Sequence, residues 1–218
     1  MENKFIPLDL QFFANKVKFG LKNVHVAHYE VVVDEETGEV TIIYDKPYRV
    51  PGAVELSLEP RGDMVEFYAD DMLYYSAPNN QGYDGALSIA LVPEDFAINA
   101  LGEEKDETDL VLTEKTTAKG KPFAMMFEFD GDEKATRHVL YNCSANRPTV
   151  TSSTKTDTVE PAADELTFVA SPRETDYAVK TKTIANTPAA IYNAWYQKVY
   201  EKTVNPSPEN PDDGGTEV

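Results

Sequence analysis

Hydrophobic and polar positions alternate along two short segments of the stretch 50–102. In residues 54–59, one side of an extended chain is apolar and the other polar, with Val54, Leu56 and Leu58 opposite Glu55, Ser57 and Glu59. In residues 86–92 the alternation is weaker, with Leu87, Ile89 and Leu91 opposite Ala86, Ser88 and Ala90. A period of two residues is typical of a half-buried β-strand. We therefore expect two strands here, each with one buried and one exposed face.

Turn residues separate further β-type segments along the rest of the chain. Gly38, and the sequence Asp-Gly-Asp at 130–132, each lie between apolar runs, as in hairpins. The expected strand pairs are 17–34 with 40–44, 123–129 with 137–143, and 165–171 with 177–184. Residues 110–112 and the Ser- and Thr-rich residues 149–158 are further candidate strands. Roughly ten short strands predict a mainly β fold, a β-sandwich or a barrel-like sheet, with one or two short flanking helices.

Two short helices are predicted beside the strands. Pro93 and two acids precede residues 96–101, and Gly102 follows them, which matches the signals for a helix start and stop. A second helix is expected over about residues 188–200, with Thr187 as its cap. A stripe recurs along it at every fourth position, formed by Ile191, Trp195 and Val199 together with Tyr192 and Tyr196. Such a stripe is expected to cover one side of the sheet or a neighbouring molecule.

A long aromatic and acidic segment, about residues 60–85, joins the two alternating segments. Its aromatic side chains are Phe67, Tyr68, Tyr74, Tyr75 and Tyr83. The segment is too rich in turn residues to be core, and long ordered loops of this kind usually bind something. Tyr and Phe bury large areas with few rotatable bonds, which is why interfaces use them. We interpret the segment as a protein-contact loop; a loop folded onto its own domain is the alternative.

Charge excludes some classes of function. The formal net charge is -18, which argues against a nucleic-acid binder and against attraction to an anionic membrane. The single cysteine excludes an internal disulfide, and no apolar run reaches the roughly 20 residues of a spanning helix. No signal-peptide pattern opens the chain, so we expect it to stay in a cytoplasm. We divide it into an arm (1–14), one β domain (15–202) and a flexible acidic tail (203–218).

No constellation of residues predicts a catalytic, cofactor or metal site. His25 and His28 are three residues apart, which puts them on opposite faces of a strand. Cys143 is expected on the face opposite His138 and roughly 17 Å from it, without a base to activate it. Carboxylates are abundant, but neither of the densest clusters matches a calcium-binding loop. A hydrolase whose two carboxylates meet from different strands is left open.

Five segments carry a family resemblance by their order and spacing. They are NKVKFGLKNV (15–24), PGAVELSLEP (51–60), FYADDMLYY (67–75), NQGYDGALSIALVPEDF (80–96) and YNAWYQKVYE (192–201). In these segments the chain resembles the major tail protein, or tail tube protein, of phages with long non-contractile tails (siphophages). The resemblance covers roughly residues 15–202.

The resemblance implies a structural virion protein of the phage tail, assembled in the host cytoplasm, and no enzyme. Six copies would close a ring, in which their sheets form a continuous β-barrel around a lumen, and the rings would stack into a tube. The implied partners are further copies of the chain, a tape-measure protein, a tail terminator and distal tail proteins. DNA would pass down the tube without specific binding. No cofactor and no membrane are implied.

Particular residues take roles from this resemblance. The aromatic loop would contact the next ring along the tube. Residues 1–14 would dock on a neighbouring subunit through Leu10, Phe12 and Phe13; a frayed terminus is the alternative. Glu55, Ser57 and Glu59, on the polar face of the first alternating strand, are the candidates for lining the lumen. Carboxylates there would repel phosphate, so that DNA slides without sticking.

A second hypothesis belongs to a different class of function. The chain would be a monomeric, acidic β-sandwich that binds a carbohydrate or a peptide through its aromatic loop. Such a module stays monomeric at high concentration and protects the loop only when ligand is present.

Overall fold

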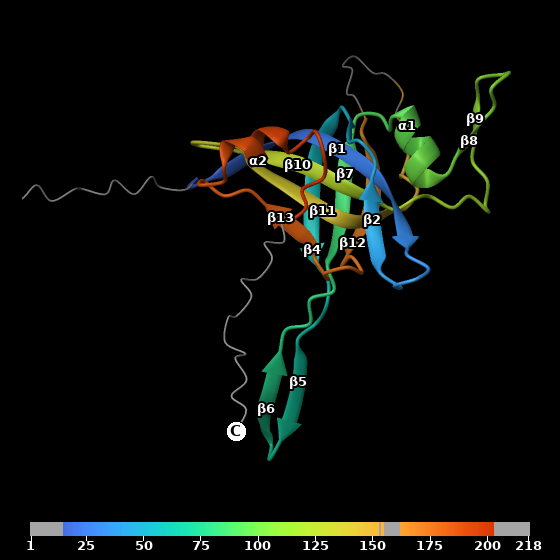
Figure 1. Cartoon of the computed structure of the whole chain (residues 1–218). Coiled ribbons are helices and arrows are strands. Elements are labelled where there is room, and N and C mark those ends of the chain that lie inside the picture. The colour runs from blue at the N-terminus through green and yellow to red at the C-terminus, as the bar shows by residue number, and fades with distance from the viewer. Residues whose placement is uncertain (1–14, 153, 155–161, 203–218) are drawn as a thin grey trace, which may run out of the picture.

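The longest strand, β1 (Lys18–Val33), connects three other strands. Its first part pairs with β10 (Phe123–Gly131), and its second part pairs with β2 (Val40–Tyr44). The short β3 (Tyr48–Arg49) pairs with β1 at His25 and Val26. The computed structural model, drawn in Figure 1, describes residues 15–152, 154 and 162–202.

A single antiparallel sheet contains most of the described strands. From β10 it continues through β11 (Thr136–Ala145), β12 (Asp164–Ser171) and β7 (Tyr83–Ile89) to β4 (Ala53–Pro60), and β13 (Lys180–Lys182) pairs with β11. The sheet curls, so that β4, at one end of the path, lies next to β1. The predicted mainly β, barrel-like architecture is therefore confirmed.

The inner face of the curl contains the larger hydrophobic cluster, which we call the inner core. Five strands (β1, β7, β10, β11 and β12), the first helix and Val50 contribute its buried side chains. Its buried members are Val24, Val26, Val50, Leu87, Ile89, Phe96, Ala100, Phe123, Met125, Phe127, Leu140, Cys143, Leu166, Phe168 and Ala170. Leu56 and Leu58 of β4 pack against it, as the alternating pattern predicts.

The outer face of β1, β10 and β11 packs against the C-terminal segment and forms the outer core. Trp195 and Val199 are 3% and 5% exposed there, against Ala27, Met126 and Tyr141. The helix α2 (Ala189–Ala194) is shorter than the predicted 188–200, but the stripe faces the sheet as expected: Trp195 and Val199 are buried, and Ile191 and Tyr196 are partly buried. Thr187 does not cap it, because the Thr187 hydroxyl accepts a hydrogen bond from the Ile184 N–H at 2.8 Å.

The first helix lies at the end of the molecule opposite α2 (Figure 1). α1 (Glu94–Phe96) continues as the π-helical turn η1 (Ala97–Leu101) and ends at Gly102, whose φ of 79° lies in the left-handed region. Pro93 and Gly102 thus bound the helix as the sequence predicts. Two small sheets stand apart from the main one: β5 (Val65–Ala69) with β6 (Met72–Ala77), and β8 (Glu104–Lys105) with β9 (Leu112–Thr113).

One predicted hairpin is wrong. β12 and β13 do not pair with each other; both pair with β11, β12 along Asn142–Ala145 and β13 along His138–Leu140. β11 is ten residues long and can hold both strands one after the other. A turn between them, closed from the Arg173 N–H to the Ala178 carbonyl at 3.1 Å, directs the chain past β12. In residues 149–158, the described part has only an isolated bridge from Thr149 to Glu165.

A buried carboxylate fixes the C-terminal segment to the sheet. Glu128 of β10 accepts hydrogen bonds from the Arg137 Nε (3.0 Å), the Tyr196 hydroxyl (3.1 Å) and the Asn23 side chain (2.7 Å). Arg137 also donates to the Tyr192 carbonyl, and its guanidinium lies 3.8 Å from the centre of the Tyr192 ring. Burial next to this carboxylate raises the pKa of Tyr196. The network joins strands β1, β10 and β11 to the segment that covers them.

This network predicts an asymmetry between two substitutions. Arg137→Met should lower the free energy of unfolding by about 3–5 kcal/mol, because it leaves the Glu128 carboxylate buried without its cation. Glu128→Gln should cost less, about 1–3 kcal/mol, because Arg137 is more exposed than Glu128 (17% against 8%) and keeps the Tyr192 carbonyl and ring as partners. Urea denaturation of dilute protein measures both. The double variant should be more stable than Arg137→Met alone; losses that simply add in the double variant would show that the two charges are not coupled.

Candidate assembly surfaces

The outer face of β4, β7 and β12 is polar and uncovered. Register places Glu55 next to Ser88, Ser57 next to Ala86, and Glu59 next to Asp84. On the other side of β7, the same positions of β12 continue the rows. We call this surface the acidic face: Glu55, Ser57, Glu59, Asp84, Ala86, Ser88, Glu165, Thr167 and Val169. None of these side chains belongs to either core of the described residues.

The composition of the acidic face separates it from the rest of the sheet. Four of its side chains are carboxylates, and neither lysine nor arginine occurs among the nine. A cation at its margin, Arg61, lies 3.4 Å from an Asp84 oxygen in an exposed ion pair. The middle of the face has no protruding side chains, because Ser57, Ala86 and Ser88 are small. The face thus presents fixed negative charge on a regular backbone frame.

Two predicted strand faces need correction at their ends. Val54 was expected on the buried side of its strand, but it is 63% exposed. The pairing of β4 with β7 shifts register between Ala53 and Glu55, and such a β-bulge turns Val54 out of the alternation. Leu91 is 73% exposed because β7 already ends at Ile89. The three lumen candidates Glu55, Ser57 and Glu59 do share one face.

β4 is also an edge strand. In the described part of the chain it pairs with β7 only, at one end of the sheet path. An edge strand presents unpaired N–H and C=O groups, to which another chain can add a strand. The acidic face therefore ends at an edge that suits pairing between copies.

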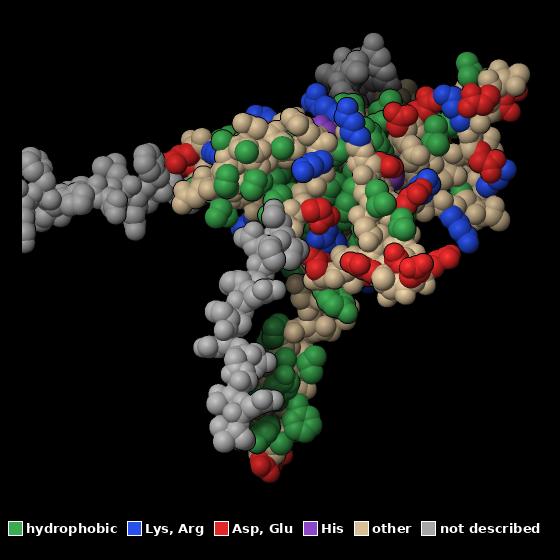
Figure 2. Space-filling model, in the orientation of Figure 1, with side chains coloured by type: hydrophobic (Ala, Val, Ile, Leu, Met, Phe, Trp, Pro, Cys, Tyr) green, Lys and Arg blue, Asp and Glu red, His purple; other side chains and the backbone are tan. Residues whose placement is uncertain are grey.

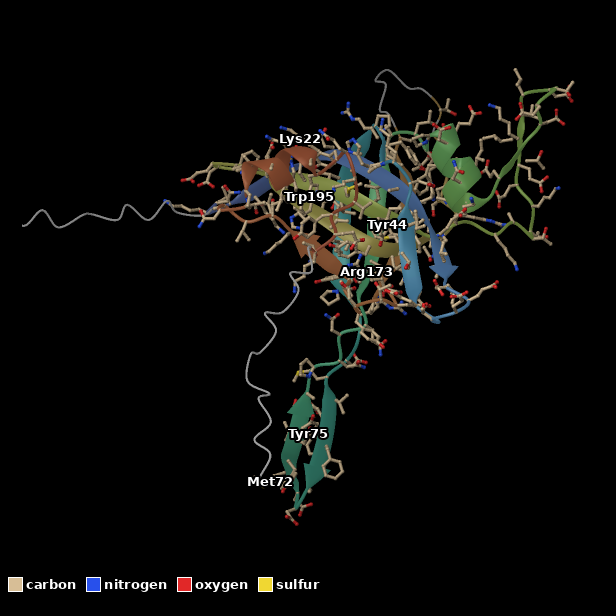
Figure 3. All side chains as sticks on the ribbon, viewed as in Figure 1. Lys22, Tyr44, Met72, Tyr75, Arg173 and Trp195 are labelled. Atoms are coloured by element: carbon tan, nitrogen blue, oxygen red, sulfur yellow. The ribbon has the colours of Figure 1, made fainter. Side chains whose placement is uncertain are left out.

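The aromatic segment is a projecting hairpin. β5 and β6 extend away from the body, as Figure 1 shows, and apolar side chains cover much of them in Figure 2. Phe67 pairs with Tyr75 on one face of the hairpin, together with Val65 and Met72. Phe67, Tyr75 and Met72 are 58%, 57% and 61% exposed, and Figure 3 labels the last two. A two-stranded sheet is marginal by itself, and an exposed apolar surface of this kind is typical of an interaction site.

The structure separates one of the five aromatic candidates from the others. Phe67, Tyr68, Tyr74 and Tyr75 lie on the hairpin and are exposed. Tyr83 instead begins β7 in the main sheet, where its hydroxyl lies 3.0 Å from the Lys180 amine and its side chain packs against the inner core. It is not part of the projecting surface.

The sequence did not predict that residues 65–77 are strands. A register shift between Phe67 and Tyr68 interrupts the alternation, and Asp70 and Asp71 form the tip in the left-handed region (φ 51° and 59°). Positive φ at both central positions is typical of a type I′ hairpin turn, which is usually signalled by Asn-Gly or Asp-Gly. With two aspartates there, the turn signal was weak.

The arm candidates Leu10, Phe12 and Phe13 lie outside the described residues, as does the segment 203–218. The first described residue, Asn15, is fixed by hydrogen bonds. Its side-chain oxygen accepts from the N–H groups of Glu133 and Lys134 at 3.2 and 3.1 Å. The chain therefore enters the domain beside the β10–β11 turn.

The histidines are packed side chains. His25 stacks on Tyr196 at the outer core, with ring centroids 4.5 Å apart, whereas His28 lies beside Tyr48 and Phe123 on the other face. Burial lowers the pKa of both. His138 stacks on Phe127 at 5.1 Å, and burial lowers its pKa to about 4. Each imidazole is thus held in its neutral form at neutral pH.

Cys143 lies on the same face as His138, so the predicted opposite placement is wrong. A register shift puts one extra residue of β11 between the pairs Phe123–Cys143 and Met125–Leu140. This bulge turns Cys143 into the inner core, on the same face of the sheet as His138 and Leu140. The thiol is fully buried, and desolvation raises its pKa, which disfavours a reactive thiolate.

Within the described ranges, no group of three or more His, Cys, Asp or Glu side chains is arranged to hold a metal ion. No helix in the same part of the chain is long and apolar enough to cross a membrane.

Comparison with known proteins identifies a family. Residues 10–205 match the family model described as phage tail tube protein. A cryo-EM structure of the anti-feeding prophage cap, a tube-terminating cap, aligns with 83% of this chain and 100% of that chain, at 14% identity and a TM-score of 0.44. A PVC sheath–tube complex of an extracellular contractile injection system, in its extended state, aligns with 77% and 92%, at 13% identity and a TM-score of 0.40. No curated protein sequence matches significantly.

The family match includes every residue that the structure describes, with both surfaces defined above. On this match the chain belongs to the phage tail tube protein family and is a structural component of a phage tail, not an enzyme.

Proposed function

We propose that this chain is the major tail tube subunit of a siphophage, and that six copies close each ring of the tube. The acidic face lines the lumen, and the projecting hairpin contacts the next ring. The observation that carries this proposal is the acidic face itself: an uncovered outer sheet surface with four carboxylates and no lysine or arginine among its nine side chains.

Electrostatics supports this orientation. DNA carries one phosphate charge per roughly 1.7 Å of duplex, and proteins that hold DNA neutralise those charges with lysine and arginine. A wall of fixed carboxylates does the opposite. Each subunit would contribute Glu55, Glu59, Asp84 and Glu165, and repulsion from all sides of a narrow channel would keep DNA centred and mobile.

The edge strand supports a closed ring. Closing a ring lets the β4 edge of one copy pair with a neighbour, which removes the exposed edge from every copy at once. The acidic faces of neighbouring copies then form one continuous wall. We infer that the tube grows in the host cytoplasm around a tape-measure protein and meets distal tail proteins and a terminator. The arm with Leu10, Phe12 and Phe13 docks on an adjacent subunit.

Electron microscopy tests the assembly. Negative-stain images of the purified protein over a concentration series, with light scattering alongside, should show rings or hollow tubes of uniform width. A protein that stays monomeric both alone and with its tape-measure and initiator proteins would contradict the proposal. In that case the monomeric binding module, which grips a carbohydrate or peptide through the hairpin, would become the better account.

Thiol labelling tests which face lines the lumen. Ser57→Cys places a thiol in the acidic face, and Lys198→Cys places a matched, exposed thiol on the segment that covers the opposite side of the curled sheet. In dissociated protein, a bulky polymer maleimide should label both variants, while buried Cys143 gives little background. In long tubes, labelling of Ser57→Cys should fall roughly tenfold or more, because the reagent cannot enter the lumen. Undiminished labelling of Ser57→Cys in tubes would place the acidic face outside.

A further inference from the structure

A second apolar surface lies at the end of the molecule away from the hairpin. Leu91, Leu101, Leu110, Leu112 and Val150 line a groove of about 550 Å³ beside η1 and β9, which we call the leucine groove. Leu91, Leu110 and Val150 are 73%, 70% and 76% exposed. Soluble proteins seldom leave such large apolar side chains clustered in water unless a partner covers them.

The chain holds one of these leucines in a strained conformation. Leu110 has a φ of 54°, in the left-handed region that a bulky side chain rarely adopts. Asp106 builds the turn that holds it: its carboxylate accepts from the N–H groups of Thr108 and Asp109 at 2.7 and 2.8 Å, and its carbonyl accepts from the Leu110 N–H at 3.0 Å. Strain at an exposed apolar residue is typical of a functional position.

The hairpin and the groove lie at opposite ends of the same strands. The hairpin leaves the sheet where Pro60 pairs with Tyr83, and the groove begins just beyond the pair of Ala53 with Ile89. Figure 1 shows the hairpin at one end of the body and α1 at the other. About eight residues of strand separate the two sites, or roughly 25 Å. A copy displaced along β4 and β7 therefore brings its hairpin towards the groove of the next copy.

We propose that the leucine groove receives the β5–β6 hairpin of a second copy of this chain, with the Phe67–Tyr75 pair as the apolar anchor. The inference rests on the proposed tube function and names the receiving surface for the hairpin. A contact between different ends of identical molecules can repeat from copy to copy, and when each copy is displaced along the strands it gives a filament instead of a closed ring. It also covers both exposed apolar surfaces at once.

A different hollow offers a competing place for the hairpin. Lys18, Lys180 and Lys182 surround a cavity of about 630 Å³ that Leu58 and Tyr83 also line. Its cations would attract Asp70 and Asp71 at the hairpin tip. However, Tyr83 marks the end of β7 from which the hairpin itself leaves, so displacement along the strands moves this hollow away from the incoming hairpin.

Salt distinguishes the two places. Contact in the lysine hollow joins opposite charges and weakens with salt. The groove is lined by acids as well, Glu103 and Asp164 among them, so an acidic hairpin tip approaches like charge. Docking of Phe67 and Tyr75 in the leucine groove is apolar, and added salt should strengthen it by screening that repulsion.

Complementation between two variants tests the proposal. The donor variant, Phe67→Thr with Tyr75→Thr, keeps β-forming residues but removes the anchor. The receiver variant, Leu110→Asn with Val150→Thr, removes the groove wall, and asparagine tolerates the positive φ. Each alone should raise the concentration needed for tubes roughly tenfold or more, with rings retained. Mixed together, they should form stacks of two rings, because one intact hairpin still meets one intact groove.

A control variant, Ile184→Thr, changes a 65% exposed residue that lines neither surface and should form tubes like the wild type. Two results would overturn the groove while leaving the tube function intact. In the first, the receiver variant forms tubes at the wild-type concentration. In the second, wild-type tubes dissociate as salt rises, and the variant Lys180→Glu with Lys182→Glu forms none. Wild-type protein that forms neither rings nor tubes, even with its tail partners, would overturn both.

Discussion

One constraint shapes the described part of the molecule: a single curled sheet buries the inner face of most of its strands, but its outer face is covered only on β1, β10 and β11. The inner core gathers Phe123, Phe127 and Phe168 from strands on both sides of the curl. Outside, Trp195 and Val199 cover β1, β10 and β11, while β4, β7 and β12 stay bare. The bare half must therefore carry polar side chains to stay in water, and it ends at an unpaired edge. This sheet therefore has one bare polar surface and one unpaired edge, the two features on which the proposed lumen and ring depend.

The two surfaces proposed for assembly use different physics, and this difference separates their roles. The proposed edge pairing at β4 would depend on backbone hydrogen bonds, which have a fixed direction and spacing, and so it would set the geometry within a ring. The hairpin and the leucine groove use apolar contact, which is non-directional and roughly proportional to buried area. Such contact tolerates small changes in the angle between rings. A long tube that bends without breaking needs both kinds of contact.

Sequence reasoning predicted the parts of this structure that follow regular periods and missed those that depend on irregularities. Alternation located β4 and β7 and put Glu55, Ser57 and Glu59 on one face, and Pro93 and Gly102 bounded the first helix. Bulges moved Val54 out of its row and turned Cys143 to the face of His138, because one inserted residue reverses a period of two. The pairing of β12 and β13 with β11 depends on distant strands, which no local pattern encodes. The leucine groove was missed for a similar reason, since Leu91, Leu110 and Val150 come from three separate loops.

The strong negative charge of the chain opposes the proposed assembly. At -18 per chain, copies repel one another at a distance, and the proposed ring, which would concentrate Glu55, Glu59, Asp84 and Glu165 in a common lumen, would add to that repulsion. The repulsion also protects the free subunit, because the hairpin exposes Phe67, Met72 and Tyr75 on a two-stranded sheet whose edges invite uncontrolled pairing. Charged side chains disfavour such pairing, and the hairpin carries three: Asp70 and Asp71 at its tip and Glu66 on its other face. In the proposed tube, the apolar contact between hairpin and leucine groove would have to offset this charge repulsion.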